Sequence, residues 1–503
     1  GAGSNGYALA DALLGLPRRI RASIDIVDPN YRNSHLMPWV QDDWKITRNL
    51  TLNLGFRYEW MGRPQAKYDT IGNFYIKAPG QAVIITPQDT GSPLVEPRPE
   101  SLGRSLLEND NNNFAPRFGF AYQASDKTVV RGAYGIFYQR DTMDYWILQA
   151  FNPPFVRTGD VTLSVNAQSI QNFPVDDLTP VVNFVTPGSK PAPYGRNVDW
   201  KEAYVQQWNL FVERSLSRDL VAKVGYVGNK GTGIPRDYYP NEGAPAPGDI
   251  QSRRPYQNLS SVLIRNSDGQ ATYHGLELLA EKRFAGGLSF VSAYTFSKAI
   301  SNQTYLDLWY GGNNKSRSPL NISHRFSSSG AWDIPYGRGR RWGTQLPGVA
   351  EAFLGGWQLG GIFVIRTGFP LTVTNGTLGD IANAGGITQV PNRISDPNLS
   401  GGDRTENVFF DTTAFTAPAR YTLGNAGANI IDGPNFWNLD ASVMKIFRVS
   451  ETKVFQLRGE LFNAFNHPNW GDPGLGYGTA TFGRVTSTSG DPRNAQIGLK
   501  FLF

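Results

Sequence analysis

The last ten residues of the chain, 494–503, alternate between two faces. One face carries four large apolar side chains, namely Ile497, Leu499, Phe501 and Phe503. The other face carries Gly498, Lys500 and Leu502. A period of two is typical of a β-strand. Such a strand needs a hydrogen-bonding partner for its backbone and an apolar medium for its apolar face. A closed β-barrel in an outer membrane supplies both, so this stretch predicts such a barrel.

The clearest example of the same alternation lies at residues 50–60. Its apolar face holds Leu50, Leu52, Leu54, Phe56, Tyr58 and Trp60, and its polar face holds Thr51, Asn53, Gly55, Arg57 and Glu59. In a soluble sandwich, the apolar face would pack in a core and the charged face would meet bulk water. In a wide barrel, the apolar face meets lipid and the charged face a wet lumen. One strand alone does not distinguish these two possibilities.

The pattern recurs along the whole chain, and we expect about 14 strands. The stretches are 18–26, 35–46, 50–60, 114–122, 128–139, 204–216, 220–228, 273–284, 288–299, 321–335, 357–368, 438–447, 452–464 and 494–503. The fold class expected is therefore all-β, an antiparallel transmembrane β-barrel.

The connections between these stretches alternate in length. One set has about two to four residues each, as in β-hairpins, with a single longer exception at 336–356. The other set is long and covers roughly 63–113, 140–200, 229–271, 300–320, 375–435 and 467–493. Short periplasmic turns and long extracellular loops are typical of an outer-membrane barrel. The last strand follows a long loop, so we expect the C-terminus to be periplasmic.

Composition agrees with many short strands. Aromatic residues make up 13% of the 503 residues, and 55 Gly and 33 Pro provide turn chemistry. No apolar run reaches the roughly 20 residues of a membrane helix. The chain has no Cys, which excludes disulfides, Cys-ligated metals and a thiol nucleophile. The net charge is +6, but the basic residues are scattered, so we expect solvated charge and no nucleic-acid partner.

Chemistry-bearing motifs are sparse. The four histidines, His35, His274, His324 and His467, show no paired metal spacing. The stretch 266–270 (NSDGQ) resembles half of a calcium loop, although Asp-Gly is also a common turn signal. We therefore expect no catalytic residue, no cofactor and no metal. The charged residues expected to face the lumen are Arg57, Glu59, Arg117, Arg458 and Glu460. Mixed charge in a wet lumen requires only solvation and pairing.

Several stretches together resemble TonB-dependent receptors of the Oar-like kind. They are WVQDDWKITRNLTLNLGFRYEW, FAPRFGFAYQ, YHGLELLAEKRF, SAYTFSKA, NISHRFSSSGAWDIPYGRGRRW, LGGWQLGGIFVIRTGFP and QLRGELFNAFNHPNW, with the terminal FLF. The resemblance covers nearly the whole chain. It implies an outer-membrane transport barrel energised through the TonB complex, with outer-membrane lipid, the barrel assembly machinery and an unknown transported substrate as further partners. It also implies that Ile497, Leu499, Phe501 and Phe503 form the signal for barrel assembly, a role compatible with simple strand closure.

Barrels of that family have 22 strands around a plug, and usually an N-terminal β-sandwich. We find no plug sequence and no TonB box, so residues 1–503 are expected to be the C-terminal barrel portion, with the missing strands and the plug upstream. An exported protein needs a signal peptide, and none precedes Gly1. Two alternatives remain open: an outer-membrane adhesin whose barrel anchors binding loops, and a soluble all-β carbohydrate-binding or hydrolase domain. The placement of the long loops at one end of the strands and the short turns at the other disfavours the soluble alternative.

Overall fold

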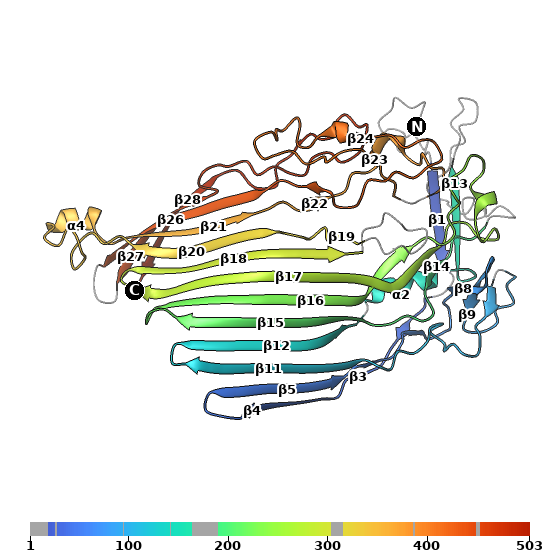
Figure 1. Cartoon of the computed structure of the whole chain (residues 1–503), viewed down its shortest axis with the longest axis horizontal. Coiled ribbons are helices and arrows are strands. Elements are labelled where there is room, and N and C mark those ends of the chain that lie inside the picture. Colours follow the sequence, from blue (N-terminus) through green and yellow to red (C-terminus); the bar gives the residue numbers. More distant parts are fainter. Residues whose placement is uncertain are drawn as a thin grey trace.

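The computed structural model of the protein describes residues 19–25, 28–93, 95–140, 142–162, 190–302, 315–385, 388–448 and 453–503. It is dominated by one curved antiparallel sheet in which strands follow one another in chain order (Figure 1). We call its thirteen consecutively paired strands the wall. They are β4 (Trp39–Lys45), β5 (Leu50–Tyr58), β11 (Phe114–Ser125), β12 (Thr128–Gln139), β15 (Ala203–Ser215), β16 (Leu220–Tyr238), β17 (Leu263–Ala285), β18 (Leu288–Ser301), β20 (His324–Asp333), β21 (Trp357–Arg366), β26 (Phe436–Arg448), β27 (Val454–Phe462) and β28 (Asn494–Leu502).

The smaller elements lie in the connections. Two short strands attach to the wall: β14 (Tyr194–Arg196), parallel to β17, and β19 (Ser316–Arg317), antiparallel to β18. The others pair as β1 (Arg19–Asp25) with β13 (Val156–Thr162), β2 (Tyr31–Arg32) with β7 (Gln65–Ala66), β3 (His35–Leu36) with β6 (Trp60–Met61), β22 (Pro370–Leu371) with β25 (Ile431–Asp432), β23 (Asn392–Arg393) with β24 (Phe415–Thr416), and β8 (Asn73–Ala78) with β9 (Gln81–Thr86) and β10 (Val95–Pro97). The helices are α2 (Met143–Ile147), η1 (Leu148–Phe151), η2 (Gln251–Arg253), α4 (Gly348–Leu354), η3 (Gly376–Leu378) and η4 (Thr412–Ala414).

The predicted strands correspond closely to the wall, with one correction. Within the predicted stretch 18–26, Arg19–Asp25 form the strand β1, but it pairs with β13 outside the wall. One edge of β1 is thus paired with a strand other than β4. Two strands are longer than predicted: β16 continues to Tyr238, and β17 starts at Leu263. The stretch 266–270, compared above with a calcium loop and a turn, lies inside this extension of β17.

Strand register gives the wall two chemically different faces. One row across seven strands is almost entirely apolar or aromatic, and consists of Leu52, Phe120, Gly132, Leu210, Tyr226, Leu276 and Phe296. The neighbouring row, one residue along, lies on the opposite face and consists of Thr51, Ala121, Arg131, Phe211, Gly225, Glu277, Thr295, Arg325 and Arg366. We call these the apolar face and the polar face. Large side chains of the apolar face, including Leu210 and Phe296, are exposed in the protein alone.

Connection lengths confirm the predicted alternation. Short turns join strands at one end of the wall, and long loops gather at the other (Figure 1). The connection between β20 and β21, which contains α4, is the long connection predicted at the short-turn end. Chain order and antiparallel pairing place the end of β28 there as well. Among the described residues, no helix is long and apolar enough to cross a membrane.

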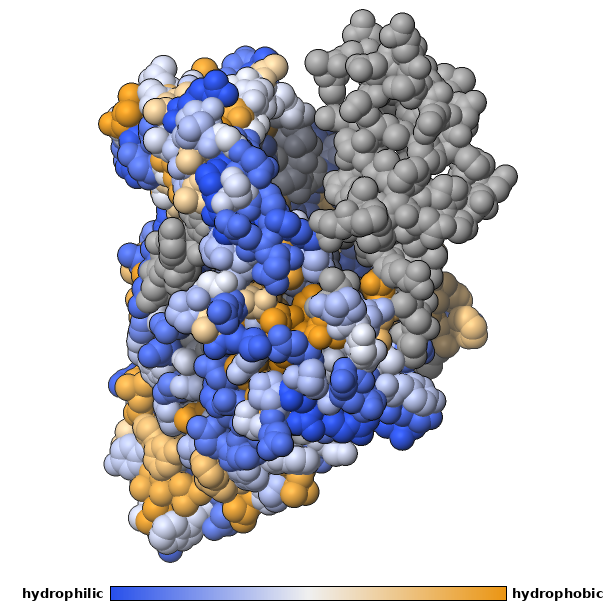
Figure 2. Space-filling model, turned by 90° about the vertical axis from the view of Figure 1, so that its right-hand side faces the viewer, coloured by the Kyte–Doolittle hydropathy of each residue, from blue (hydrophilic) through white to orange (hydrophobic). Residues whose placement is uncertain are grey.

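The described parts of five of the long connections form two compact bodies that contain nearly all of the buried apolar residues described. The N-terminal loop body comprises residues 59–113, 142–162, 190–202 and 239–262, and its core includes Ile85 and Leu106. The C-terminal loop body comprises residues 367–385, 388–435 and 463–493, and its core includes Phe409. Viewed from this end, the coloured surface is largely hydrophilic, with hydrophobic atoms gathered at the lower left and in a smaller group near the centre (Figure 2). A wall without a core of its own is stable only if another medium covers its apolar face.

The wall has two edges, β4 and β28, and every described residue of both strands is exposed. Thirteen antiparallel strands form an odd number, so β4 and β28 run in the same direction, from the long-loop end to the short-turn end. Direct pairing of the two edges would therefore be parallel. An entirely antiparallel barrel requires an odd number of further strands between them.

Candidate binding face and loop bodies

The structure places the charged residues predicted for the lumen in two groups. Arg57, Glu59 and Arg117 lie near one edge of the wall, where the Nε of Arg57 is 3.4 Å from Oε1 of Glu59. Arg117 follows on the neighbouring strand, with its guanidinium 4.7 Å from the centre of the Phe137 ring. Glu59 lies just beyond β5 and is buried, whereas the sequence pattern had assigned it to the strand. Charges paired in this way provide electrostatic contacts and no nucleophile.

Arg458 and Glu460 lie near the other edge, on β27. Their side chains form an ion pair with 2.5 Å between Nη2 and Oε1, and Gln496 of β28 donates to Glu460. Strand register puts both residues on the polar face. The two groups are thus far apart across the wall, so they form no single charged cluster.

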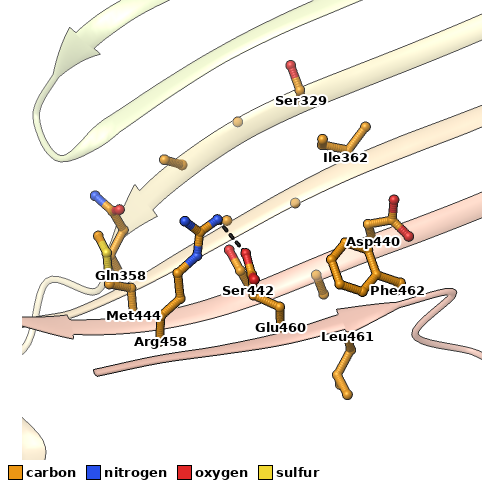
Figure 3. Close-up of a pocket in the computed structure, with 15 residues that line it drawn as sticks. Ser329, Gln358, Ile362, Asp440, Ser442, Met444, Arg458, Glu460, Leu461 and Phe462 are labelled. Carbon is orange, nitrogen blue, oxygen red and sulfur yellow. Dashed lines mark ion pairs between the residues drawn. The ribbon is translucent and has the colours of Figure 1, made fainter. Parts of the chain in front are cut away.

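The Arg458–Glu460 pair borders a groove of about 440 Å³ on the polar face (Figure 3). Figure 3 shows Ser329, Gln358 and Ser442 on the same side of the sheet as this pair, and Leu461 on the opposite side. The space exists partly because Gly360 has no side chain; a Cβ there would come within 2.6 Å of the Ser442 hydroxyl. Hydroxyl, amide and charged groups at this position can form hydrogen bonds with a polar solute.

Buried asparagines hold the loop bodies in fixed conformations. The Nδ2 of Asn241 donates to the carbonyls of Tyr256 and Leu259 at 3.0 and 3.2 Å, and its Oδ1 accepts from the Tyr256 amide at 2.7 Å. Asn152 likewise donates to the Gly72 and Tyr194 carbonyls, both at 2.7 Å. Backbone groups in loops have no partners in a β-ladder, and these buried side-chain amides provide hydrogen bonds in place of such partners. The loops at this end are therefore structured bodies rather than loose connections.

Two buried arginines add further links inside the N-terminal loop body. Arg63 pairs with Glu202, and their side chains are only 2% and 6% exposed. The guanidinium of Arg196 lies between the rings of Trp146 and Trp200, 4.1 and 4.4 Å from their centres. Such cation–π stacking gains strength when water is excluded.

Tyr31 contacts the same cluster. Its hydroxyl donates to the carbonyl of Trp146 at 2.6 Å. Burial raises the pKa of the Tyr31 hydroxyl well above its usual range, and the positive charge of Arg196 opposes this only in part. The hydroxyl therefore remains a protonated donor at any physiological pH.

A second groove, of about 870 Å³, lies beside the C-terminal loop body. Its lining includes Arg317, Arg393, Asp396 and Asn398. Arg317 is oriented by two bonds to the Asn429 carbonyl, at 3.1 and 2.9 Å. Hydrogen bonds from the backbone and side chain of Asn398 lower the pKa of Asp396, and the charges of Arg393 and Arg317 lower it further. The groove therefore carries both charge signs and suits a polar ligand.

The four residues predicted as the assembly signal lie on the apolar face of β28 or just beyond it. Ile497, Leu499 and Phe501 face Gly459, Leu457 and Phe455 of β27 in the register. Phe503 follows, 92% exposed, with its ring stacked 5.9 Å from that of Phe501.

Sequence reasoning missed the grooves and the buried pairs, since each combines residues from distant segments. Two of the histidines form hydrogen bonds with tyrosines. The Tyr226 hydroxyl lies 2.6 Å from Nδ1 of His274, and the Tyr294 hydroxyl lies 2.8 Å from Nδ1 of His324. Within the described part of the chain, no group of three His, Asp or Glu side chains is arranged to hold a metal ion.

A family comparison identifies the class of protein. The sequence model of the family described as "outer membrane beta barrel domain" matches residues 1–496. The chain belongs to this family. An outer membrane beta barrel domain resides in the bacterial outer membrane, so the exposed apolar face of the wall is the surface that meets lipid. The alternative of a soluble all-β domain is thereby excluded.

Three solved structures that match the chain are of longer proteins. The outer-membrane transporter YddB from Escherichia coli matches with a TM-score of 0.47 and 9% identity, over 93% of this chain and 45% of that one. The ferripyoverdine receptor of Pseudomonas aeruginosa matches with a TM-score of 0.45 and 11% identity, over 93% and 38%. The FrpB iron transporter from Neisseria meningitidis matches with a TM-score of 0.42 and 12% identity, over 93% and 46%. The chain spans less than half the length of each. No curated protein matches significantly.

Proposed function

We propose that residues 1–503 form the barrel portion of a TonB-dependent outer-membrane receptor that transports a large or scarce substrate. The observation that carries the proposal is the division of the molecule into a two-faced wall and folded loop bodies. A wall with a polar face bears its long loops at one end, with the α4-containing connection as the one exception among those described, and the described parts of these loops form compact bodies with buried cores. Preorganised loops favour selective capture, and a polar face suits the passage of a polar solute. The long loops are then extracellular, and the short turns and α4 periplasmic.

The edges of the wall support a larger barrel. An antiparallel barrel needs an odd number of strands beyond the thirteen of the wall. A barrel of 22 strands, as in plugged outer-membrane transporters, satisfies this condition. We propose that the additional strands and the plug lie upstream, and that the plug connects the barrel to the TonB complex. Arg57, Glu59, Arg117, Arg458 and Glu460 would then face the lumen.

The C-terminal strand supports a second proposal, which concerns the barrel assembly machinery. Its apolar row ends in Phe503 and is exposed along a free wall edge. We propose that the barrel assembly machinery reads Ile497, Leu499, Phe501 and Phe503 as an insertion signal.

A second candidate function is adhesion, in which the barrel only anchors the loop bodies. The groove of about 870 Å³ beside the C-terminal loop body, at the long-loop end, offers a binding surface for it. Its lining of both charges and amides suits a surface glycan as well as a transported solute. Transport and adhesion share the same wall and differ in whether TonB engages the protein.

The test is cross-linking to TonB in living cells. The natural protein would carry an epitope tag in the β17–β18 turn at 286–287, and cells would be treated with formaldehyde before the tagged protein is isolated. Transport predicts an adduct containing TonB. A tagged protein that reaches the outer membrane as a folded, heat-modifiable barrel yet forms no TonB adduct would overturn transport in favour of adhesion.

A further inference from the structure

The connection between β20 and β21 differs from the other turns at its end of the wall. Residues 336–356, here called the α4 connection, contain the helix Gly348–Leu354 and project beyond the sheet (Figure 1). The other described turns at this end, such as 286–287, are only a few residues long. Reversing the chain between two strands needs only a few residues, so the protruding helix must have another role.

Two charged side chains of the α4 connection form hydrogen bonds within it. The carboxylate of Glu351 accepts the Arg338 amide at 2.8 Å. The guanidinium of Arg338 donates to the Leu346 carbonyl from Nε and Nη2, at 3.2 and 3.1 Å. These hydrogen bonds join the helix to the loop that precedes it.

The exposed side chains of the helix itself are apolar. Val349 and Phe353, four residues apart and therefore on one side of the helix, are 74% and 71% exposed. Leu354 and Trp342 are also exposed. A helix facing water normally turns its apolar side inward. Here the arrangement is inverted, as in segments that lie at a membrane surface.

The C-terminal end of the helix is bonded to residues on the apolar face of the wall. The indole Nε1 of Trp357 donates to the Phe353 carbonyl at 2.8 Å. Lys445 donates from Nζ to the Gly355 carbonyl. Trp357 and Lys445 face each other in the register on the apolar face. The end of α4 is therefore fixed at the level of Trp357, at the rim of the wall, where amphipathic rings meet lipid head groups.

Charge complements this position. The α4 connection contains three arginines and one acidic residue, and the acidic residue, Glu351, is already engaged. Arg340 pairs with Asp333 at 3.0 Å. Arg341 is exposed, with its guanidinium 5.3 Å from the centre of the Trp342 ring. Arginine binds phosphate groups well, so Arg341 is placed for a phospholipid head group.

We propose that the α4 connection is an interfacial anchor that inserts Val349, Phe353 and Leu354 into the head-group region of the adjoining leaflet, while Arg341 binds phospholipid phosphate. The anchor rests on the outer-membrane location of the family and is independent of transport. It would fix the depth of the wall at its short-turn end.

The absence of Cys from the chain allows a direct test. The protein carrying Phe353→Cys would be labelled with an environment-sensitive fluorophore and reconstituted in vesicles of phosphatidylethanolamine and phosphatidylglycerol. Asp126→Cys, in the exposed β11–β12 turn at the same end, is the matched control. Heat-modifiable gel mobility confirms that each variant is folded.

The anchor predicts that the label at 353 is quenched by lipids with head-group-proximal nitroxides and protected from aqueous iodide, with the reverse at 126. Equal iodide quenching at both positions would overturn the proposal. Protection at 353 found only in native membranes, and lost in vesicles, would indicate a protein partner and also overturn it. Adding Arg341→Gln should weaken the nitroxide quenching, and unchanged quenching would refute the role of Arg341.

Discussion

Replacing Arg63 with Met should loosen the N-terminal loop body while leaving the wall folded. The Arg63 side chain pairs with Glu202 and also donates to the carbonyls of Trp200, at 2.5 Å, and Glu108, at 3.1 Å. It thus joins the connection that follows β5 to the one that precedes β15. Met has a similar length and none of these donors.

The expected cost follows from the burial of the pair. With side chains 2% and 6% exposed, loss of Arg63 leaves the Glu202 carboxylate without its buried counter-charge. Breaking such a pair from one side typically costs about 3–5 kcal/mol. Local opening of the loop body should become about a hundredfold to a few thousandfold more frequent. The double variant Arg63→Met/Glu202→Gln removes the buried charge and should recover part of this loss.

Native-state hydrogen exchange in detergent measures this opening. The amide of Glu108, which donates to the Val198 carbonyl at 2.8 Å, is the reporter. Lys77→Met is the control, because the Lys77–Glu96 pair is about half exposed and such pairs contribute only about 0–1 kcal/mol. Exchange at Glu108 that rises less than about tenfold in Arg63→Met would refute the reasoning.

Three further predictions concern the wall. Deleting Phe503 should sharply lower the amount of folded barrel in the outer membrane, and normal heat-modifiable levels would contradict its role in assembly. Val443→Arg, on the apolar face, should cost about 2–4 kcal/mol in a urea titration in vesicles; Ser442→Arg, on the polar face, should cost far less, and equal costs would refute the assignment of faces. Gly225→Val should cost about 1–3 kcal/mol, because its side chain would collide with the Phe211 ring; an unchanged urea midpoint would show that the ring moves freely.

Strand positions in the wall were predictable because alternation is a local property. At residues 50–60, the period of two alone places Leu54 and Arg57 on opposite faces, and the pairing with β11 confirms it. For 18–26 the same local logic predicted the strand correctly but not its place in the wall. Alternation identifies a strand but not its partner, and β1 pairs with β13.

The longer reach of β16 and β17 could not be predicted from alternation. The added ladder coincides with ion pairs between the two strands: Arg236 with Asp268, and Arg265 with Asp237, each at 2.5 Å. These residues read as loop in the sequence, since charged and Gly-containing stretches lack an apolar face. Only cross-strand partners show that they belong to a ladder.

The grooves and buried pairs were unpredictable for a related reason. Arg63 and Glu202 are 139 positions apart, and their chemistry is common among solvated residues. Nothing in either neighbourhood marks them as partners. Packing of the loops brings them together, and single-sequence patterns contain no record of that packing.

The account depends on which face of the wall meets lipid, and paired labelling in β17 tests this directly. Leu276→Cys and Glu277→Cys are adjacent positions on opposite faces near the middle of the wall. In vesicles, a fluorophore at 276 should be quenched by nitroxides on lipid chains and shielded from iodide, and a fluorophore at 277 should show the opposite. Equal behaviour at the two positions, or a reversed pattern, would contradict a wall with lipid on its apolar face and water on its polar face.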